Sequence, residues 1–196
     1  MIHELLRGKQ VILASASPRR QEIFRFLGIK ALQMPADIPE DLLPVTPRKL
    51  VQIHALSKAE AIRPRVDPDC LIVAADTVVY HNSQILGKPA DAFQAAEYLT
   101  RLSDSFHYVY TGLSLAFQHR CLTSYTKSKV EFYKLTASEI ESYLKTGEPL
   151  DKAGAYGIQG YGSQFIKTIH GCYFNVMGFP VSLFYLMLKD LMGNKR

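Results

Sequence analysis

Residues 15–20 of this chain carry side chains of the types that bind anions. Two serines, a proline and two arginines follow an apolar run here. Ser17 suits the N-cap of a helix, and Pro18 suits its first position, where no N–H donor is needed. Free N–H groups at a helix start favour an anion, and Arg19 and Arg20 add positive charge. The pattern predicts either a phosphate site or a capped surface helix with two solvated arginines. It is not a Walker loop, because the glycine–lysine pattern of that loop is absent.

Further along the chain lie three carboxylates that could bind a ligand or a metal ion. Asp76 follows a continuous apolar run, residues 71–75, which is typical of a strand buried on both faces. A carboxylate at the end of such a strand lies where α/β proteins bind ligands, although a hairpin-start or turn residue is the alternative. Asp37 and Glu40 lie in a loop broken by prolines and are solvated if they act alone. Paired with Asp76, they could bind Mg²⁺, which prefers carboxylate oxygen and shares its shell with substrate phosphates.

Two lysines are ambiguous from the sequence. Lys58 lies one helical turn past His54, and we expect its side chain on the exposed face of a helix. Lys88 precedes a proline in a loop and could be either a ligand or a solvated residue.

The segment of residues 151–162 contains four glycines, at positions 154, 157, 160 and 162. Glycines permit positive φ angles and a close approach of the backbone to another group. Tyr156 could stack on a base, and Gln159 could both donate a hydrogen bond to a base and accept one from it. A purely structural loop is the alternative, but we favour a ligand-binding loop because ordering so many glycines is costly in conformational entropy. The spacing is not that of a dinucleotide-binding motif.

The elements that must position these residues alternate between helices and strands, which predicts an α/β domain with a mixed sheet. Thr46 and Pro47 open a helix, and its predicted apolar stripe consists of Leu50, Ile53, Leu56, Ala59 and Ile62. Further helices are expected at residues 91–102, after the capping box at residues 136–139, and at residues 180–191. Long strands are expected at residues 107–117 and 123–133. Hairpins are expected at residues 78–86 and 165–176.

The composition of the 196 residues limits the class of protein. A hydrophobic fraction of 47% can fill a core, so we expect a single domain, residues 1–196. The net charge of +5 suits an anionic substrate, but the chain has no basic stripe, so we expect no nucleic-acid partner. Cys70, Cys121 and Cys172 form no metal-binding pair, which indicates reduced thiols in a cytoplasmic protein. We expect no signal peptide and no membrane span, since no apolar run is long enough. The six histidines and the serines match no zinc or hydrolase-triad spacing.

Five motifs in order resemble the Maf family of nucleoside triphosphate pyrophosphatases. They are LASASPRR at residues 13–20, KA at 58–59, ADT at 75–77, GKP at 87–89 and DKAGAYGIQG at 151–160. The first and last are highly specific, and the resemblance spans residues 11–188. It implies an inosine-triphosphate-pyrophosphatase-like (Maf/Ham1) fold, which is an elongated mixed sheet flanked by helices with a cleft between two lobes. It also implies a homodimer that hydrolyses a nucleoside triphosphate to the monophosphate and pyrophosphate, with a divalent metal cation, Mg²⁺ or Mn²⁺.

The resemblance assigns roles residue by residue. Asp76 corresponds to the family's proposed proton acceptor, and Glu40 corresponds to an acidic residue that helps to hold the metal. A metal-ligand role is the alternative for Asp76, and the sequence does not choose between the two roles. Pro39 stands where many members carry a carboxylate, which weakens the match of the metal loop. The substrate-discriminating positions are Arg19, Thr77 and Gln159, and the residues that line the triphosphate cleft are Ser15, Arg20, Lys58 and Lys88.

The last motif also separates branches of the family. Lys152 and Gln159 match the branch that acts on UTP and dTTP, whereas a branch acting on 7-methyl-GTP carries Cys and Glu at these positions. A glutamine amide both donates and accepts, which suits a uracil or thymine edge, and a carboxylate only accepts. We therefore expect a pyrimidine nucleoside triphosphate pyrophosphatase that cleans the nucleotide pool. The alternatives are a pyrophosphatase for 7-methyl-GTP or non-standard purine triphosphates, and a nucleotide-binding regulator of cell division.

Overall fold

The computed structural model describes residues 1–193 and divides them into two compact units. Unit 1 comprises Met1–Asp76, Thr111–Thr126 and the chain from Gly178 onward, and unit 2 comprises Thr77–Tyr110 and Lys127–Met177. The strands form a mixed sheet in the order β2-β1-β3-β5-β6-β7, and β4 pairs with β3. The expected mixed α/β architecture is therefore confirmed. The single domain and the cleft between lobes stay predictions, and each unit is described by itself.

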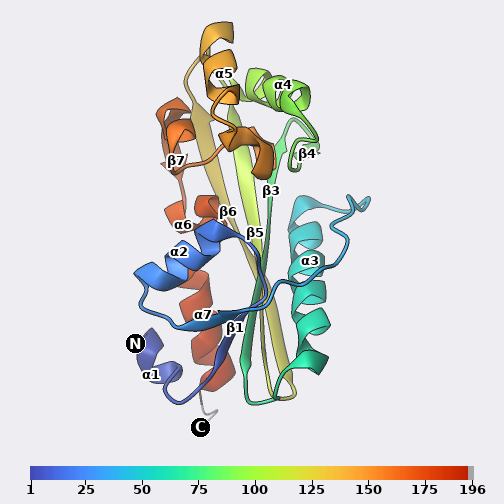
Figure 1. The fold of residues 1–196 in the computed structure, drawn as a ribbon, viewed down its shortest axis with the longest axis vertical. Coiled ribbons are helices and arrows are strands. Elements are labelled where there is room, and N and C mark those ends of the chain that lie inside the picture. The colour runs from blue at the N-terminus through green and yellow to red at the C-terminus, as the bar shows by residue number, and fades with distance from the viewer. Residues whose placement is uncertain (194–196) are drawn as a thin grey trace. The chain divides into compact units, whose positions relative to one another are not determined.

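Unit 1 carries the N-terminal and C-terminal elements, which can be followed in Figure 1. Its elements are α1 (Ile2–Leu5), β1 (Val11–Leu13), α2 (Pro18–Phe26), β2 (Ala31–Gln33), α3 (Pro47–Ile62), the 3-10 helix η1 (Arg63–Arg65) and α7 (Val181–Met192), with the first part of β3 (Leu71–His81) and parts of β5 (Phe106–Phe117) and β6 (Arg120–Phe132).

The core of unit 1 fixes α3 against the sheet. β1 pairs in parallel with β2 and with β3, and every residue of β1 is buried. Apolar side chains from β1, β3 and α3 form one cluster, which includes Ile12, Ala14, Ala59, Ile62, Ile72 and Ala74. α3 also lies directly on β5, because a Cβ added at Gly112 would stand 2.1 Å from the Val51 carbonyl oxygen. Only glycine fits at that contact without moving the helix backbone.

Unit 2 holds the shorter helices and its own core. Its elements are β4 (Gln84–Leu86), α4 (Ala92–Leu102), α5 (Ala137–Leu144), the 3-10 helices η2 (Glu148–Asp151), η3 (Ala153–Ala155) and η4 (Tyr161–Phe165), β7 (Ile166–His170) and α6 (Tyr173–Met177), together with the remaining parts of β3, β5 and β6. The core packs α4 and α5 against the strands, and Phe132 and Tyr156 stack edge to face in it at 4.7 Å.

Two predicted helix starts and the predicted hairpin at residues 78–86 are confirmed. Thr46 caps α3 by accepting from the Lys49 N–H, and a reciprocal capping box at Thr136 and Glu139 starts α5. The hairpin of β3 and β4 turns at two residues with positive φ, Asn82 and Ser83. The three cysteines, all within the described chain, are free. No helix among residues 1–193 combines the length and apolar character needed to cross a membrane.

The predicted hairpin at residues 165–176 is wrong in its second half, where α6 replaces a strand. The reason is a buried polar contact that the local pattern does not contain. The Asn175 amide donates to the Val109 carbonyl and to Ser128 Oγ, each at 3.0 Å. Ser128 also holds the backbone of Cys172 at 3.1 Å. These contacts turn the chain into a helix.

Candidate active site

Two polar residues of α3, His54 and Lys58, are buried in the interior of unit 1. The buried residues of α3 are Leu50, Val51, His54, Ala55, Lys58, Ala59 and Ile62, which follow helical spacing on one face. The predicted stripe is therefore wrong at Leu56, which is 39% exposed. The expectation that Lys58 is exposed is also wrong, because Lys58 is only 6% exposed. His54 and Lys58 lie one turn apart in this buried face, so both need polar partners there.

Those partners meet at Asp76, which is 4% exposed. Lys58 Nζ donates to Asp76 Oδ1 at 2.7 Å, and His54 Nδ1 lies 3.1 Å from Asp76 Oδ2. Burial by itself would raise the pKa of this carboxyl. The His54 hydrogen bond, the charge of Lys58 and the charge of Arg20 outweigh burial and hold the pKa well below its ordinary value. Asp76 is thus an ionised carboxylate with both oxygens engaged.

Asp76 does not lie where the sequence pattern placed it. β3 continues without interruption from Leu71 to His81, so Asp76 is inside the strand rather than at its end. The β-branched residues after it, Thr77, Val78 and Val79, suit a continued strand. The turn-residue alternative is therefore wrong as well.

The same two residues of α3 also hold the loop between β2 and α3. Lys58 Nζ lies 2.6 Å from Glu40 Oε1, and His54 Nε2 lies 3.1 Å from the Asp41 carbonyl oxygen. Both nitrogens of the His54 ring therefore face acceptors, so both carry a proton in this arrangement. The hydrogen bond to Asp76 accordingly raises the pKa of His54. Lys58 and His54 each join this loop to Asp76.

The stretch at residues 15–20 also lies in unit 1. Arg20 is buried, with its Nε donating to the Gly178 carbonyl at 2.8 Å and a terminal nitrogen donating to Ser15 Oγ at 2.9 Å. Arg20 is therefore not a solvated surface arginine. Ser17 occupies the N-cap of α2 and Pro18 its first turn, as predicted, but the Ser17 hydroxyl makes no capping bond. Instead the Ser17 N–H donates to Ser15 Oγ at 3.2 Å. Arg19 is half-buried at the start of α2.

Glu40 and Asp76 are the two carboxylates of this site that could together hold a divalent cation. Lys58 bridges the two carboxylates, so they lie near one another. Mg²⁺ binds through one or two carboxylates and fills its shell with water and substrate phosphates. In the described part of the chain no group of three or more His, Cys, Asp or Glu side chains could hold a metal ion by itself. An ion held by these two carboxylates would complete its shell with water or with phosphate oxygens.

The other predicted residues lie in unit 2. Thr77 is half-buried, Lys88 is exposed after β4, and Gln159 is half-buried in the glycine-rich segment. The Gly154 N–H donates to the Gly87 carbonyl at 3.0 Å, which joins that segment to the loop that carries Lys88. The structure thus brings together two groups of the predicted residues. Ser15, Arg20, Glu40, Lys58 and Asp76 gather in unit 1, and the segments with Lys88 and Gln159 meet in unit 2.

The glycines of residues 151–162 have structural causes within unit 2. Gly154 has a φ of +70°, and an added Cβ would stand 2.7 Å from Val79. Gly160 has a φ of +84°, and an added Cβ would stand 2.6 Å from the Glu148 carboxylate. That carboxylate accepts from the N–H groups of Tyr161 and Gly162. Internal packing therefore accounts for Gly154 and Gly160 without a ligand.

Tyr156 does not serve as a stacking surface. It is buried in the core of unit 2, where its hydroxyl lies 2.7 Å from His107 Nε2. The interpretation of Tyr156 as a base-stacking residue is wrong, because the side chain is buried and its ring makes edge-to-face contacts with Phe132 and His107.

Comparison with known proteins identifies the family. The model of the family described as "Maf-like protein" matches residues 10–191. The chain belongs to the Maf family. It is 40% identical over 186 residues to a dTTP/UTP pyrophosphatase of Aquifex aeolicus, covering 93% of this chain and 95% of the relative. It is also 40% identical over 183 residues to dTTP/UTP pyrophosphatases of Bacillus cereus and Bacillus cytotoxicus, covering 93% of this chain and 90% and 95% of those relatives.

Solved structures that resemble this Maf chain include two Ham1 proteins. The Staphylococcus aureus Ham1 protein aligns with 95% of this chain and 100% of its own, with a TM-score of 0.49 and 13% identity. A Ham1 protein from Coxiella burnetii aligns with 81% of this chain and 80% of its own, with a TM-score of 0.47 and 14% identity.

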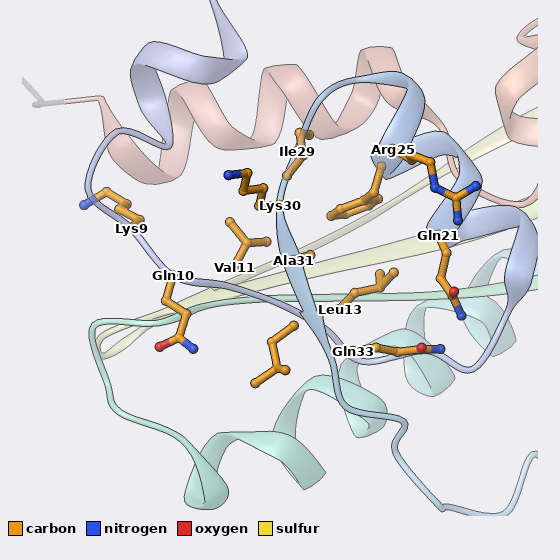
Figure 2. A pocket seen from close by; sticks show the side chains of 12 residues that line it. Lys9, Gln10, Val11, Leu13, Gln21, Arg25, Ile29, Lys30, Ala31 and Gln33 are labelled. Carbon is orange, nitrogen blue, oxygen red and sulfur yellow. The ribbon is translucent and has the colours of Figure 1, made fainter.

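Unit 1 of this Maf chain has a hollow whose lining residues do not include Asp76, His54 or Lys58. It has a volume of about 640 Å³ and lies beside β1, β2 and α2. Figure 2 shows that the lining mixes apolar side chains such as Val11 and Ile29 with polar ones, among them Lys9, Lys30 and Arg25. None of the predicted site residues lines this hollow.

Sequence reasoning on this Maf chain missed His54 as a site residue. Its position gave the one available signal, because His54 lies four residues from both Leu50 and Lys58 and so shares their face of α3. The predicted apolar stripe included Ile53 and Leu56, and it therefore did not place His54 on the buried face.

Proposed function

We propose that this protein hydrolyses dTTP and UTP to the nucleoside monophosphates and pyrophosphate. The observation that carries the proposal is the 40% identity, over 93% of the chain, to relatives named dTTP/UTP pyrophosphatases. Gln159 in the last motif supports a pyrimidine substrate, because its amide matches the alternating acceptors and donor of a uracil or thymine edge. The physiological role that follows is the removal of unwanted nucleotides from the pool.

In this proposal Asp76 orients the attacking water and binds a metal cation together with Glu40. A general base works best when its pKa lies near the reaction pH. The pKa of Asp76 lies well below its ordinary value because His54 and Lys58 stabilise the carboxylate, so Asp76 is a weak proton acceptor. We therefore favour the ligand and orienting role over the base role. A bound Mg²⁺ or Mn²⁺ would neutralise charge on the triphosphate and lower the pKa of water.

The proposed contacts to the triphosphate are Ser15, Arg19, Arg20, Lys58 and Lys88. Positive charge that is fixed before the reaction stabilises the charge that develops on the phosphate oxygens. The Gly178 carbonyl and Ser15 Oγ accept hydrogen bonds from the Arg20 guanidinium and so fix its position. Arg19, Thr77 and Gln159 would select the base and sugar.

We also propose that the protein is a cytoplasmic homodimer that acts on free nucleotides and needs neither nucleic acid nor membrane. Free cysteines suit a reducing compartment. Light scattering after gel filtration would test the dimer, and a monomer at micromolar concentration would contradict it.

A substrate panel tests the proposed function. The purified protein is assayed for pyrophosphate release from UTP, dTTP, CTP, 7-methyl-GTP and dITP, with Mg²⁺ and with Mn²⁺. We expect the highest kcat/KM for UTP and dTTP and no turnover in the presence of a chelator. Turnover of 7-methyl-GTP far above UTP would move the chain to the other branch. Binding of nucleotides without release of pyrophosphate would favour a regulator.

A further inference from the structure

We propose that His54 is a positioning residue that fixes the Asp76 carboxylate and the loop carrying Glu40 to the same face of α3. The proposal rests on the proposed function, since it concerns how the site for that reaction is built. It assigns a task to a side chain that none of the five family motifs in this sequence contains.

The first support is the double engagement of the His54 ring. The ring is 5% exposed, and its two nitrogens reach two different segments of unit 1. Nδ1 lies 3.1 Å from Asp76 Oδ2, 22 residues along the chain, and Nε2 lies 3.1 Å from the Asp41 carbonyl, 13 residues back. A buried histidine needs partners for both nitrogens, and here the partners are a site carboxylate and the backbone beside Glu40.

The second support is the orientation of the Asp76 carboxylate. Lys58 holds Oδ1 and His54 holds Oδ2, so the plane of the carboxylate is fixed by one contact at each oxygen. Removal of His54 would leave Oδ2 without this contact and allow the carboxylate to rotate about its terminal bond. A group that binds a cation or orients water loses effectiveness when it is misplaced by small distances.

The third support is the loop itself. Residues 34–46 contain no helix or strand, and three of these residues are prolines without a backbone N–H, at positions 35, 39 and 44. Glu40 is 45% exposed at its side chain and reaches Lys58 from this loop. The Asp41 carbonyl contact of His54 therefore places the loop next to the Glu40 contact of Lys58.

Two near-isosteric variants separate the two contacts of His54. In His54→Asn the amide nitrogen occupies the position of Nδ1, so it can donate to Asp76 but not reach Asp41. In His54→Gln the amide nitrogen occupies the position of Nε2. It can therefore donate to the Asp41 carbonyl, but Asp76 Oδ2 loses its donor. His54→Leu removes both contacts. Melting temperatures of all three establish that each variant folds.

Three readouts are made on each variant of the full chain. They are kcat and KM for UTP, the affinity for Mn²⁺ alone measured by calorimetry, and deuterium exchange of residues 36–46. We expect His54→Asn to keep kcat and Mn²⁺ affinity within about threefold of wild type, while the loop exchanges faster. We expect His54→Gln and His54→Leu to lose about tenfold or more in kcat and in Mn²⁺ affinity, with little change in KM, since such outer partners contribute about 10–100-fold.

The result that would overturn the proposal is an equal effect of all three variants. Equal kcat, Mn²⁺ affinity and loop exchange would show that His54 only fills space, whether the shared effect is small or follows the melting temperature. Failure of the proposed function would look different. Wild type would then release no pyrophosphate from UTP or dTTP, while the metal-affinity and exchange measurements would still separate the Asn and Gln variants.

Discussion

Lys58 Nζ lies 2.7 Å from Asp76 Oδ1, and both side chains are at most 7% exposed. The pair joins the middle of α3 to the middle of β3, 18 residues apart in the chain. Two buried charges of opposite sign are stable only together, because either one alone would be an uncompensated charge in a poorly solvated environment. The ionised state of the candidate catalytic carboxylate therefore depends on residues outside its strand, His54 and Lys58.

Replacement of Lys58 by glutamine should lower both activity and stability. We expect a loss of about 3 kcal/mol in the free energy of unfolding, the lower end for breaking a buried pair, and a fall of at least about tenfold in kcat for UTP. Urea unfolding and pyrophosphate release measure the two effects. Lys49→Gln is the matched control, because Lys49 is exposed on the same helix. Equal behaviour of the two variants would contradict the role of Lys58.

Replacement of Asp76 by asparagine should nearly abolish turnover. The substitution keeps the size of the side chain and removes its charge, so we expect a loss of about 100-fold or more in kcat, as when an electrostatic contact to the transition state is removed. Asp190→Asn serves as the control, because Asp190 is an exposed carboxylate on α7 that belongs to none of the predicted site residues. Turnover of Asp76→Asn near that of wild type would exclude both the ligand role and the base role.

The parts of the fold that the sequence predicts are those set by local interactions. Thr46 with Pro47 and the capping box at Thr136 determine helix starts within a few residues, and the structure has helices at both places. The burial of Lys58 could not be predicted locally, because it depends on Asp76 in another element. The family motifs compensated for this, since they placed Lys58 and Asp76 in one site where helical periodicity alone placed Lys58 on the surface.

The same distinction explains the helix at Tyr173–Met177. The residue types of this segment favour a strand, which is why the sequence predicts a hairpin at residues 165–176. Asn175 instead satisfies its buried amide on Val109 and Ser128, which are 66 and 47 residues away in the chain. Long-range contacts of buried polar groups override the local preference.

Replacement of Gly112 by alanine should destabilise the protein through α3. The new Cβ would stand 2.1 Å from the Val51 carbonyl oxygen and 2.4 Å from its carbon, so the backbone of α3 or β5 must move. We expect a loss of about 1–3 kcal/mol in the free energy of unfolding, as for other overpacked sites. Gly87→Ala is the control in urea unfolding, because nothing lies within 4 Å of its added Cβ. If Gly112→Ala were as stable as this control, α3 would not lie so close to β5.

His107 should make the stability of the protein fall in acid. Burial lowers the pKa of His107 from about 6.5 to about 3, and in the described chain its Nδ1 has no hydrogen-bond partner. Between pH 6.5 and about 3, the imidazole of His107 binds a proton in the unfolded chain but stays neutral in the folded chain. The stability due to neutral His107 is therefore complete above pH 6.5 and is lost between pH 6.5 and about 3, by up to about 1.4 kcal/mol per pH unit.

Urea unfolding between pH 7 and pH 4.5 measures this dependence. His107→Gln can keep a hydrogen bond to Tyr156 while removing the titrating ring, so its stability should fall less steeply with decreasing pH than that of wild type. His119→Gln, at an exposed turn, should follow the wild-type slope. Parallel slopes for wild type and His107→Gln would show that His107 is protonated without cost in the folded protein.

The proposed hydrolysis is tested most directly by turnover of UTP in H₂¹⁸O, which shows which product receives the oxygen of the attacking water. If the protein cleaves between the α- and β-phosphates by attack of water at the α-phosphorus, the products are UMP and pyrophosphate, and the label appears in UMP. We predict one ¹⁸O per UMP and unlabelled pyrophosphate. Label in pyrophosphate or in inorganic phosphate, or no pyrophosphate from either UTP or dTTP, would contradict the account.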